Sequence, residues 1–417
     1  MQYEPDCQSE HETGTLSVQQ ALQNIKNRIH PVSGFEQVAT REALNKVLAK
    51  DVLSTINVPA FTNAAMDGYA IRYEDIQANK NTNLNIVGSA YAGNPSKTRV
   101  SSGDCIRIMT GAALPEGTDT VVMQEHVHKE NNHICIKTTY DKYQNVRFMG
   151  EDLKQGEVAL SAGQKLKAAD IGLIASLGIS EVCVTRNIRV AFFSTGDELR
   201  GLGETLEAGQ IYDSNRYTIY SMLKNFGADI IDMGIIRDEP VALRNAFQTA
   251  AANADVLITT GGVSVGDADY VKEILTELGD IHFWKIAMKP GRPLAVGAIN
   301  KTFFFGLPGN PVSAMVTFYQ FVQPALRQLR GQKATDNVTI RLKCASSLSK
   351  RPGRVDFQRG IIFMTENGDY QVKSTGDQGS HMLSSMCRAN CFIVLSKACD
   401  GIVAGDFVEV QPFEGLY

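Results

Sequence analysis

The chain has 417 residues, with 41 lysines and arginines against 45 aspartates and glutamates, and its net charge is −4. This length predicts two to four domains, and contents of 43% apolar and 21% charged residues are typical of globular proteins with buried cores. The near-balanced charge argues against nucleic acid as a partner. No run of about 18 apolar residues occurs, so no membrane span is expected. The acidic, polar start lacks a signal-peptide pattern, which favours a cytoplasmic location.

Eight cysteines are scattered along the chain, without a Cys-x-x-Cys pair or a histidine cluster at zinc spacing. Free thiols in a reducing cytosol are the simplest interpretation. Cys387 and Cys391 fall in a segment that reads as a strand, and neither residue is assigned a role.

The first half of the chain is expected to hold an inserted β-rich domain. Apolar residues at three- and four-residue spacing predict a helix that begins at Ser17 and ends at Pro31, followed by a short helix and a strand up to residue 58. Short β-branched runs between turns indicate a β-rich module over residues 59–147. The expected domains are a polar extension at 1–15, a linking domain of 16–58 and 148–186, and the inserted domain at 59–147. The N-terminal helix is a candidate to pack on the domain that follows.

Strands and helices alternate from residue 187 to residue 330. Apolar strands are predicted at 188–194, 229–236, 256–260, 281–286, 294–298 and 303–306, and helices at 214–226, 241–253, 270–278 and 312–329. This alternation predicts an α/β domain with a mostly parallel sheet covered on both faces, and ligands in such sheets sit beyond the carboxyl ends of the strands. Residues 331–417 alternate short strands with turns, which predicts a C-terminal β-barrel or sandwich, with the barrel preferred.

Cations gather around two proline turns in the α/β region. Lys285, Lys289 and Arg292 surround a strand end, and Leu307-Pro308-Gly309-Asn310-Pro311 opens an apolar helix. Cations beside tight turns and a helix N-terminus suit a multiply charged anion such as a phosphate ester. Acidic turns lie upstream, at residues 196–198, 237–239 and 266–269. Carboxylates beside a phosphate-binding basic cluster indicate a bridging divalent cation.

Each motif also has an ordinary structural interpretation. Residues 195–198, taken alone, are better explained as a helix cap with a solvated glutamate, and Asp269 fits the first turn of a helix. The lysines fit a solvated surface, and Trp284 fits the core. The glycine-rich loop at 260–266 suits a phosphate or a pterin edge, but it is neither a Walker loop nor a dinucleotide fingerprint. Further turns contain five candidate ligand-binding residues: Asp67, Thr110, Asp152, Arg359 and Ser380.

The chain offers no Ser-His-Asp order and no nucleophilic Cys-His pair. Covalent catalysis is therefore the weaker mechanism. Lewis-acid and electrostatic catalysis around a bound anion is the stronger one.

Taken together, the motifs resemble one family, the molybdopterin molybdenumtransferases, which are MoeA-like proteins related to the C-terminal domain of gephyrin. The matching motifs, in chain order, occupy residues 63–70, 107–112, 150–152, 194–199, 236–238, 261–270, 283–291, 306–313 and 352–360. The resemblance runs from about residue 16 to the C-terminus. Arg292 stands where a lysine is frequent, and Asp267 where a glutamate is frequent, so each keeps its type of charge.

The resemblance implies four domains, an elongated homodimer and a reaction. Adenylylated molybdopterin is hydrolysed as molybdate enters its dithiolene, which gives molybdenum cofactor and AMP with the help of Mg²⁺. The implied catalytic residues are Asp67, Asp152, Glu198, Asp238, Asp269, Lys285 and Lys289, with Glu198, Asp238 and Asp269 as metal ligands. The implied substrate-binding residues are Thr110, Gly261, Gly262, Ser264, Arg292, Pro308, Pro311, Arg359 and Ser380. Some of these residues are expected to meet the main cleft only across the dimer interface. Other proteins of molybdenum cofactor biosynthesis are further expected partners.

Two alternatives remain open at this point. A molybdopterin adenylyltransferase has a fold that resembles residues 187–330 alone, and the additional β-domains argue against it. A gephyrin-like scaffold would bind pterin or protein partners without turnover. The carboxylates at Glu198, Asp238 and Asp269 favour catalysis, because a scaffold would not need all three.

Overall fold

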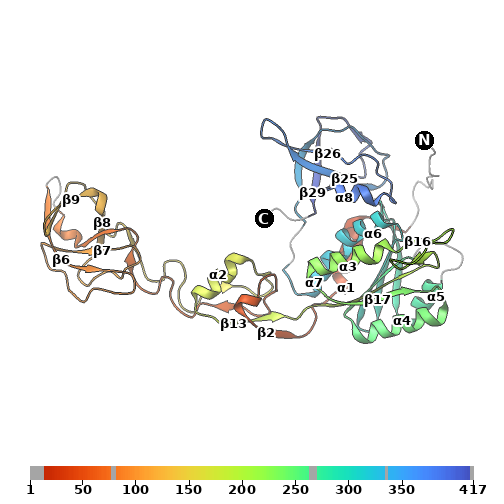
Figure 1. Ribbon diagram of the computed structural model, residues 1–417, viewed down its shortest axis with the longest axis horizontal. Coiled ribbons are helices and arrows are strands. Elements are labelled where there is room, and N and C mark those ends of the chain that lie inside the picture. The colour runs from red at the N-terminus through yellow and green to blue at the C-terminus, as the bar shows by residue number, and fades with distance from the viewer. Residues whose placement is uncertain (1–13, 77–80, 263–269, 334–336, 414–417) are drawn as a thin grey trace. The chain divides into compact units, whose positions relative to one another are not determined.

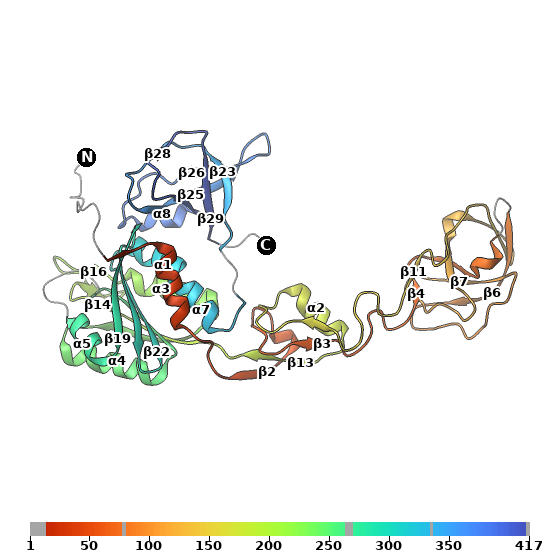
Figure 2. The ribbon, with the colours of Figure 1, turned by 180° about the vertical axis from the view of Figure 1, so that it is seen from behind.

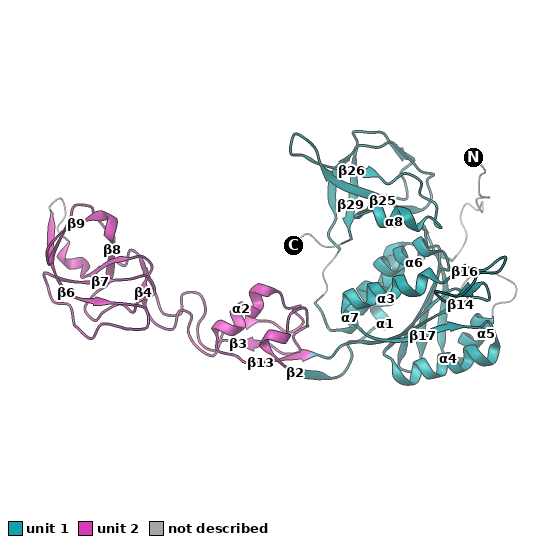
Figure 3. Cartoon of the chain, in the orientation of Figure 1, with its two compact units in different colours: residues 1–36, 185–417 teal, residues 37–184 magenta. Residues whose placement is uncertain are grey.

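The computed structural model describes residues 14–76, 81–262, 270–333 and 337–413 (Figure 1). The chain forms two compact units, one of residues 1–36 and 185–417 and one of residues 37–184 (Figure 3). Among the described residues, no helix combines the length and the apolar composition needed to cross a membrane.

A seven-stranded sheet forms the centre of the first unit. Its strands follow the order β1 (Thr15–Leu16), β19 (Asp280–Ile286), β21 (Pro293–Ile299), β22 (Thr302–Leu307), β18 (Val256–Thr260), β14 (Arg189–Thr195) and β17 (Asp229–Ile236). Only β21 runs antiparallel to its neighbours. A two-stranded ribbon of β15 (Leu199–Arg200) and β16 (Ile211–Tyr212) follows β14. The sheet confirms the predicted mostly parallel α/β fold.

Helices cover both faces of this sheet because its strands are apolar on both sides. Val190 and Phe192 belong to one core cluster, and Ala191 and Phe193 to the other, as alternation along a strand requires. The first face packs against α1 (Val18–Arg28), α3 (Ser214–Phe226), α6 (Pro311–Thr317) and α7 (Gln323–Leu329), and a π-helical turn (Phe318–Val322) joins the last two (Figure 2). The second packs against α4 (Pro240–Asn253) and α5 (Tyr270–Leu278).

The ends of these helices follow local sequence signals. A capping box between Ser17 and Gln20 begins α1. Asp213 caps α3, and Gly227, with φ of +81°, ends it in the left-handed conformation. Gln328 donates to two carbonyls at the end of α1, so the N-terminal helix packs on the α/β fold.

The C-terminal region closes into a five-stranded barrel, which confirms the preferred prediction. Its strands pair in the order β25 (Val355–Met364), β26 (Tyr370–Ser374), β23 (Ile340–Cys344), β29 (Phe407–Pro412) and β27 (Cys391–Leu395), and β27 pairs again with β25. The short strand β20 (Met288–Lys289) joins β25, and β24 (Leu348–Ser349) pairs with β28 (Gly401–Ile402). Phe357 and Phe392 of the barrel share a core cluster with α6 and α7, so the barrel and the α/β domain are packed together.

The second unit contains an antiparallel-rich sheet and a smaller α/β part. The sheet has the order β8 (Thr120–Met123), β5 (Gly68–Ile71), β7 (Asp104–Ile108), β6 (Thr82–Ala90), β10 (His133–Ile136) and β9 (Val127–Glu130), and β4 (Asn63–Ala64) pairs with β11 (Val146–Arg147). The smaller part pairs β2 (Phe35–Ala39) with β13 (Glu181–Thr185) and β3 (Val52–Leu53) with β12 (Val158–Leu160), beside α2 (Ala168–Ser176).

Two local predictions are wrong. Cys387 lies in helix α8 (Leu383–Arg388) and only Cys391 lies in a strand, because the backbone turns to an extended conformation at Ala389, between the helix and β27. The short helix expected between residues 35 and 58 is a single 3-10 turn (Thr40–Glu42), since strand β2 already uses the residues before it. Cys105, Cys135, Cys183, Cys344, Cys387, Cys391 and Cys399, the cysteines of the described part, are free thiols.

Candidate active site

Four parallel strands end side by side at one edge of the sheet. Their neighbour order is β22, β18, β14 and β17, and in register Thr260 faces both Leu307 and Ser194, while Thr195 faces Ile236. The hydroxyls of Ser194 and Thr260 lie 2.9 Å apart. The segments that follow these strands therefore converge at the edge where parallel sheets bind ligands.

Two of the predicted acidic residues lie beside Thr195, the last residue of β14. The Thr195 hydroxyl donates a hydrogen bond to the Asp238 carboxylate, which begins the segment after β17. The exposed Glu198 carboxylate folds back over Gly196. A Cβ at position 196 would lie only 2.6 Å from Glu198 Oε2, so the carboxylate occupies the space that a side chain there would need. Gly196, with φ of +149°, permits this turn. The structure thus brings Glu198 and Asp238 to one strand end.

The glycine loop after β18 packs directly on the same strand end. A Cβ on Gly261 would lie 2.3 Å from the Thr195 carbonyl oxygen, and one on Gly262 would lie 2.6 Å from Val271 Cγ2. Both glycines have positive φ, +89° and +64°. Only glycine combines this conformation with this close approach. The predicted site residues Ser264 and Asp269 lie outside the described residues.

The turn of residues 307–311 connects this acidic region with the barrel. The Gly261 N–H donates to the Leu307 carbonyl at 3.3 Å, and a Cβ on Gly309 would lie 4.0 Å from Gly261 Cα. Pro308 is buried, and Pro311 is the first residue of α6. The next N–H, that of Val312, donates to the Ser380 carbonyl at 3.2 Å. The 307–311 turn therefore contacts the glycine loop at one end and the Ser380 loop at the other.

The predicted lysines lie shortly before Gly291, in the segment that leads from β19 to a loop packed on α6. Lys285 is the penultimate residue of β19, which runs in the same direction as β22, so it lies at the same edge of the sheet. Lys289 of β20 lies opposite Asp356 of β25 in the strand pairing that joins this segment to the barrel. The Ile286 N–H donates to the Arg292 carbonyl at 2.7 Å. A Cβ on Gly291 would lie 2.7 Å from Thr317 Oγ1, so this loop packs on α6. Both lysine side chains are exposed.

Arg359 is a buried cation held by neutral groups. Its residue is 1% exposed, and its guanidinium donates to Ser385 Oγ and to the Gly379 carbonyl, each at 2.9 Å. Burial lowers the pKa of Arg359, yet arginine remains charged at physiological pH. The bond to Gly379 fixes the loop that carries Ser380. Arg359 and Ser380 therefore lie beside α6 of the same chain.

Asp67 and Thr110 meet in the second unit. Asp67 Oδ1 accepts from both the Thr110 N–H and the Thr110 hydroxyl, each at 2.7 Å. These two hydrogen bonds lower the pKa of Asp67 from its ordinary value of 3.8, and the bond from the backbone N–H has the larger effect. Burial has a smaller, opposing effect. Gly68 is required beside it, because a Cβ there would lie 1.9 Å from the Val122 carbonyl oxygen. Asp152 is exposed, and its backbone N–H donates to the Val58 carbonyl.

Replacing Thr110 with valine is expected to raise the pKa of Asp67, because the hydroxyl that favours the charged carboxylate is lost while the backbone donor remains. A lowered folded-state pKa stabilises the protein above the unfolded value near 3.8, and this stabilisation disappears as the pH falls through the folded-state value. In Thr110→Val, the free energy of unfolding should therefore fall less steeply as the pH drops below about 3.8. An NMR titration of the Asp67 carboxyl group measures the shift directly.

Thr118→Val is the matched control, because the Thr118 hydroxyl donates to the Pro115 carbonyl in the same unit and not to a carboxylate. It should leave the Asp67 titration unchanged. An equal titration in the wild-type protein and in Thr110→Val would contradict the hydrogen-bond explanation.

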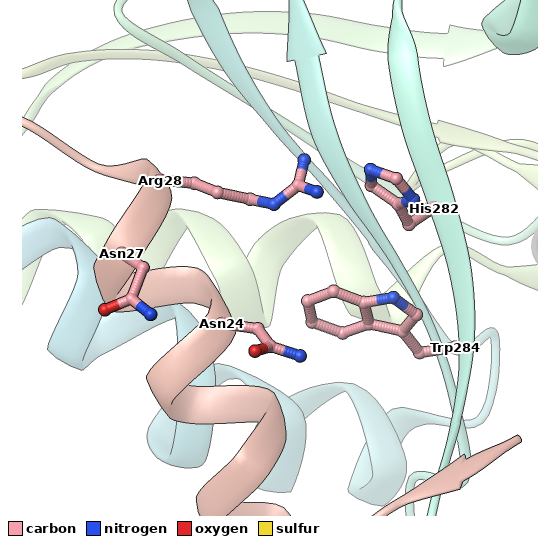
Figure 4. Close-up of a pocket in the computed structure, with 5 residues that line it drawn as sticks. All are labelled: Asn24, Asn27, Arg28, His282 and Trp284. Atoms are coloured by element: carbon pink, nitrogen blue, oxygen red, sulfur yellow. The ribbon is translucent and has the colours of Figure 1, made fainter.

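A separate pocket of about 320 Å³ lies between α1 and β19 (Figure 4). Asn24, Asn27 and Arg28 line it from the helix, and His282 and Trp284 line it from the strand. Trp284, expected in the core, is half-buried and packs against the core while also lining this pocket. None of the predicted site residues is part of the lining.

Three consecutive regions of the chain match known protein families. Residues 16–178 match the MoeA N-terminal region (domains I and II), residues 191–328 a probable molybdopterin binding domain, and residues 341–413 the MoeA C-terminal region (domain IV). Together these regions define a multidomain protein of the molybdopterin-binding class. The chain belongs to the MoeA family, as the resemblance in its sequence predicted.

Relatives and solved structures agree with this membership. A molybdopterin molybdenumtransferase of Haemophilus influenzae is 44% identical over 403 residues, which cover 96% of this chain and 99% of the relative. A molybdopterin molybdenumtransferase from a Nostoc species is 40% identical over 381 residues, which cover 89% of this chain and 87% of that relative. The crystal structure of a molybdopterin biosynthesis MoeA protein from Pyrococcus horikoshii OT3 superposes with a TM-score of 0.83 at 29% identity, covering 96% of this chain and all of the other.

The sequence analysis overlooked two residues of this edge. Thr195 was considered only as part of a turn, but it is the hydrogen-bond partner of Asp238. Asn215, in the first turn of α3, donates to the Gly309 carbonyl at 2.6 Å. The Asp213-Ser214-Asn215 sequence signals a helix cap, but nothing in it identifies a partner 94 residues further along the chain.

Proposed function

We propose that this chain inserts molybdate into adenylylated molybdopterin and hydrolyses the adenylate, releasing molybdenum cofactor and AMP. The observation that carries this proposal is the 307–311 turn, which touches the glycine loop beside Asp238 and the loop of Ser380 beside Arg359. Carboxylates and cations that are distant in sequence are thereby joined through one rigid turn. Such an arrangement suits a substrate that carries phosphates together with an incoming oxyanion.

The cations have the chemistry to hold the negative charges of both substrates. Molybdate is a dianion and the adenylylated pterin carries a phosphoanhydride. Lys285 and Lys289 are exposed point charges suited to phosphate or molybdate oxygens, and Arg359 is positioned by three hydrogen bonds to neutral acceptors. Arg292 adds a guanidinium on the same loop as the lysines. In this proposal the Gly261 and Gly262 backbone lies against the substrate, where no side chain intervenes.

Glu198 and Asp238 are the proposed magnesium ligands, with Asp269 as the third. Mg²⁺ is commonly held by one or two carboxylates together with substrate phosphates, so two hard oxygen donors at one strand end fit this ion. The described residues contain no group of three side chains arranged to hold a metal by themselves. When bound, the ion would polarise the phosphoanhydride. The Thr195 hydroxyl would orient the Asp238 carboxylate toward it.

We propose a homodimer, in which Asp67, Thr110 and Asp152 reach the substrate of the partner copy. Exposed apolar and aromatic side chains on the β15–β16 ribbon, the loop between its strands and α3 support self-association. They are Leu202, Leu206, Ile211, Tyr212, Tyr217 and Tyr220, each at least 38% exposed. Aromatic side chains are enriched at protein interfaces. Sedimentation of the full chain tests the assembly.

A cytoplasmic location and contacts with other proteins of molybdenum cofactor biosynthesis complete the proposal. The free thiols of the described residues fit a reducing compartment. Release of a reactive cofactor to a waiting protein would require a contact between the two. Co-purification from the native cytosol tests both statements.

The decisive experiment incubates the purified chain with adenylylated molybdopterin, magnesium and molybdate. AMP release that requires molybdate supports the insertion reaction. An adenylyltransferase would instead form the adenylylated pterin from ATP, and a scaffold would bind the pterin without releasing AMP. The adenylyltransferase is not favoured, because the family match extends beyond residues 191–328 into both flanking regions.

Lys285→Ala is expected to lower kcat/KM for AMP release about tenfold to 100-fold, which is the range for a lost hydrogen bond to a charged group. Lys301→Ala is the matched control, since Lys301 is exposed in the turn before β22, at the opposite edge of the sheet. The control should behave as the wild-type protein. Normal turnover by Lys285→Ala would remove this lysine from the mechanism.

A further inference from the structure

The first turn of α3 lies against the 307–311 turn. Asn215 donates from Nδ2 to the Gly309 carbonyl oxygen at 2.6 Å. This orientation of the amide is fixed chemically, because a carbonyl oxygen can only accept and therefore must face the NH₂ group. A third segment, in addition to the glycine loop and the Ser380 loop, thus holds the 307–311 turn.

The support behind Asn215 is rigid. Asp213 is 2% exposed, and its Oδ1 accepts from the Arg216 N–H at 3.0 Å, which caps α3. Arg216 in turn donates from Nε to Asp232 Oδ1 at 2.8 Å, which ties the helix to β17. The start of α3 is therefore fixed to the sheet. The hydrogen bond from Asn215 in turn fixes Gly309 relative to α3.

Asn215 is poorly explained by stability alone. Its Oδ1 is buried and has no hydrogen-bond partner among the described residues. A buried acceptor without a partner is unfavourable and offsets much of the gain from the bond that Nδ2 donates. An alanine would avoid this unfavourable burial. A residue whose net effect on stability is small, but which fixes a turn at the candidate active site, is better explained by positioning.

We infer that Asn215 is a positioning residue, which holds the 307–311 turn in the orientation that the reacting substrate requires. This inference rests on the proposed function. The hydrogen bond restrains the Gly309 carbonyl, so that Pro308 and Pro311 on either side of it keep their places between the acidic and basic groups. Small displacements of such a turn reduce turnover strongly, because the reacting groups must be held in a narrow geometry.

The test compares Asn215→Ala and Asn215→Asp with the wild-type chain. Asn215→Ala should lower kcat/KM for molybdate-dependent AMP release about tenfold, the range for one lost hydrogen bond, at an unchanged Tm. Backbone amides of residues 307–313 should exchange hydrogen faster. The aspartate variant cannot donate while ionised but can donate when protonated. Its activity relative to wild type should therefore recover as the pH falls toward about 4, the ordinary pKa of an aspartate, whereas the alanine defect should be independent of pH.

Asn253→Ala is the matched control. Asn253 also donates from Nδ2 to a backbone carbonyl, that of Thr249 at 2.8 Å, but it lies at the opposite edge of the sheet. The inference is overturned if Asn215→Ala matches this control both in the hydrogen-exchange rates of the 307–313 amides and in kcat/KM for AMP release. If the wild-type chain releases no AMP, the proposed function fails. The exchange rates then still decide whether Asn215 braces the turn.

Discussion

Asp238→Ala is expected to lower molybdate-dependent AMP release about 100-fold to 1000-fold, the effect of removing one preorganised electrostatic group from an active site. Asp238 is half-buried at the carboxyl end of β17, and its one hydrogen bond from a described side chain comes from Thr195. Its removal should therefore change the chemistry more than the fold. Quantifying AMP against time, with a thermal melt of the same sample, separates the two effects.

Glu239→Gln is the control for this experiment. Glu239 is exposed and directly follows Asp238, and its side chain makes a long ion pair of 4.0 Å with Arg237 and no capping hydrogen bond to α4. Such surface pairs contribute little, so this variant should retain wild-type turnover and stability. A strong loss in Glu239→Gln, or normal turnover in Asp238→Ala, would exclude the specific role of Asp238.

The second large effect is expected from Gly261→Ala, on stability. An alanine in the left-handed conformation, with φ of +89°, costs about 1–3 kcal/mol. Its Cβ would also lie 2.3 Å from the Thr195 carbonyl oxygen, so the strand end or the glycine loop must move. The free energy of unfolding should fall by at least that amount, and AMP release should fall with it.

The chain offers a selective probe for this measurement. Its single tryptophan, Trp284, lies on β19 in the same unit as Gly261, so urea unfolding followed by tryptophan fluorescence reports that unit. Gly172→Ala is the control, because Gly172 lies in α2 of the other unit and a Cβ there meets nothing within 4 Å. Equal fluorescence transitions in the two variants would contradict the close packing of Gly261 on Thr195.

The α/β region was predicted well because its signals are local. The helix at residues 214–226 and the strand at 256–260 begin and end where the sequence places them, and α5 ends at Leu278 as predicted. Buried parallel strands are continuous apolar runs, and the helices between them are amphipathic with caps such as Asp213 and Gly227. The helix expected at 312–329 contains a π-helical turn at Phe318–Val322, which no local residue preference signals.

The short elements around the barrel were predicted less well. The segment around Cys387 has residues common in strands, but its partners decide its conformation, and it forms α8 where Ser385 Oγ accepts from Arg359. Trp284 was expected in the core. Its exposure also depends on α1, which packs beside β19 and leaves a pocket next to the indole ring. Such outcomes depend on segments that lie 26 residues away in the first case and more than 250 in the second.

By itself, the sequence determined the family, the kinds of charge in the candidate site and the strand ends at which most of them lie, because these are properties of short motifs. Only the tertiary structure decided which motifs touch. It joined Thr195 to Asp238, Gly261 to Leu307, Ser380 to Val312 and Asn215 to Gly309. Each of these contacts spans tens of residues and depends on strand order and helix packing, which no local pattern of residues specifies.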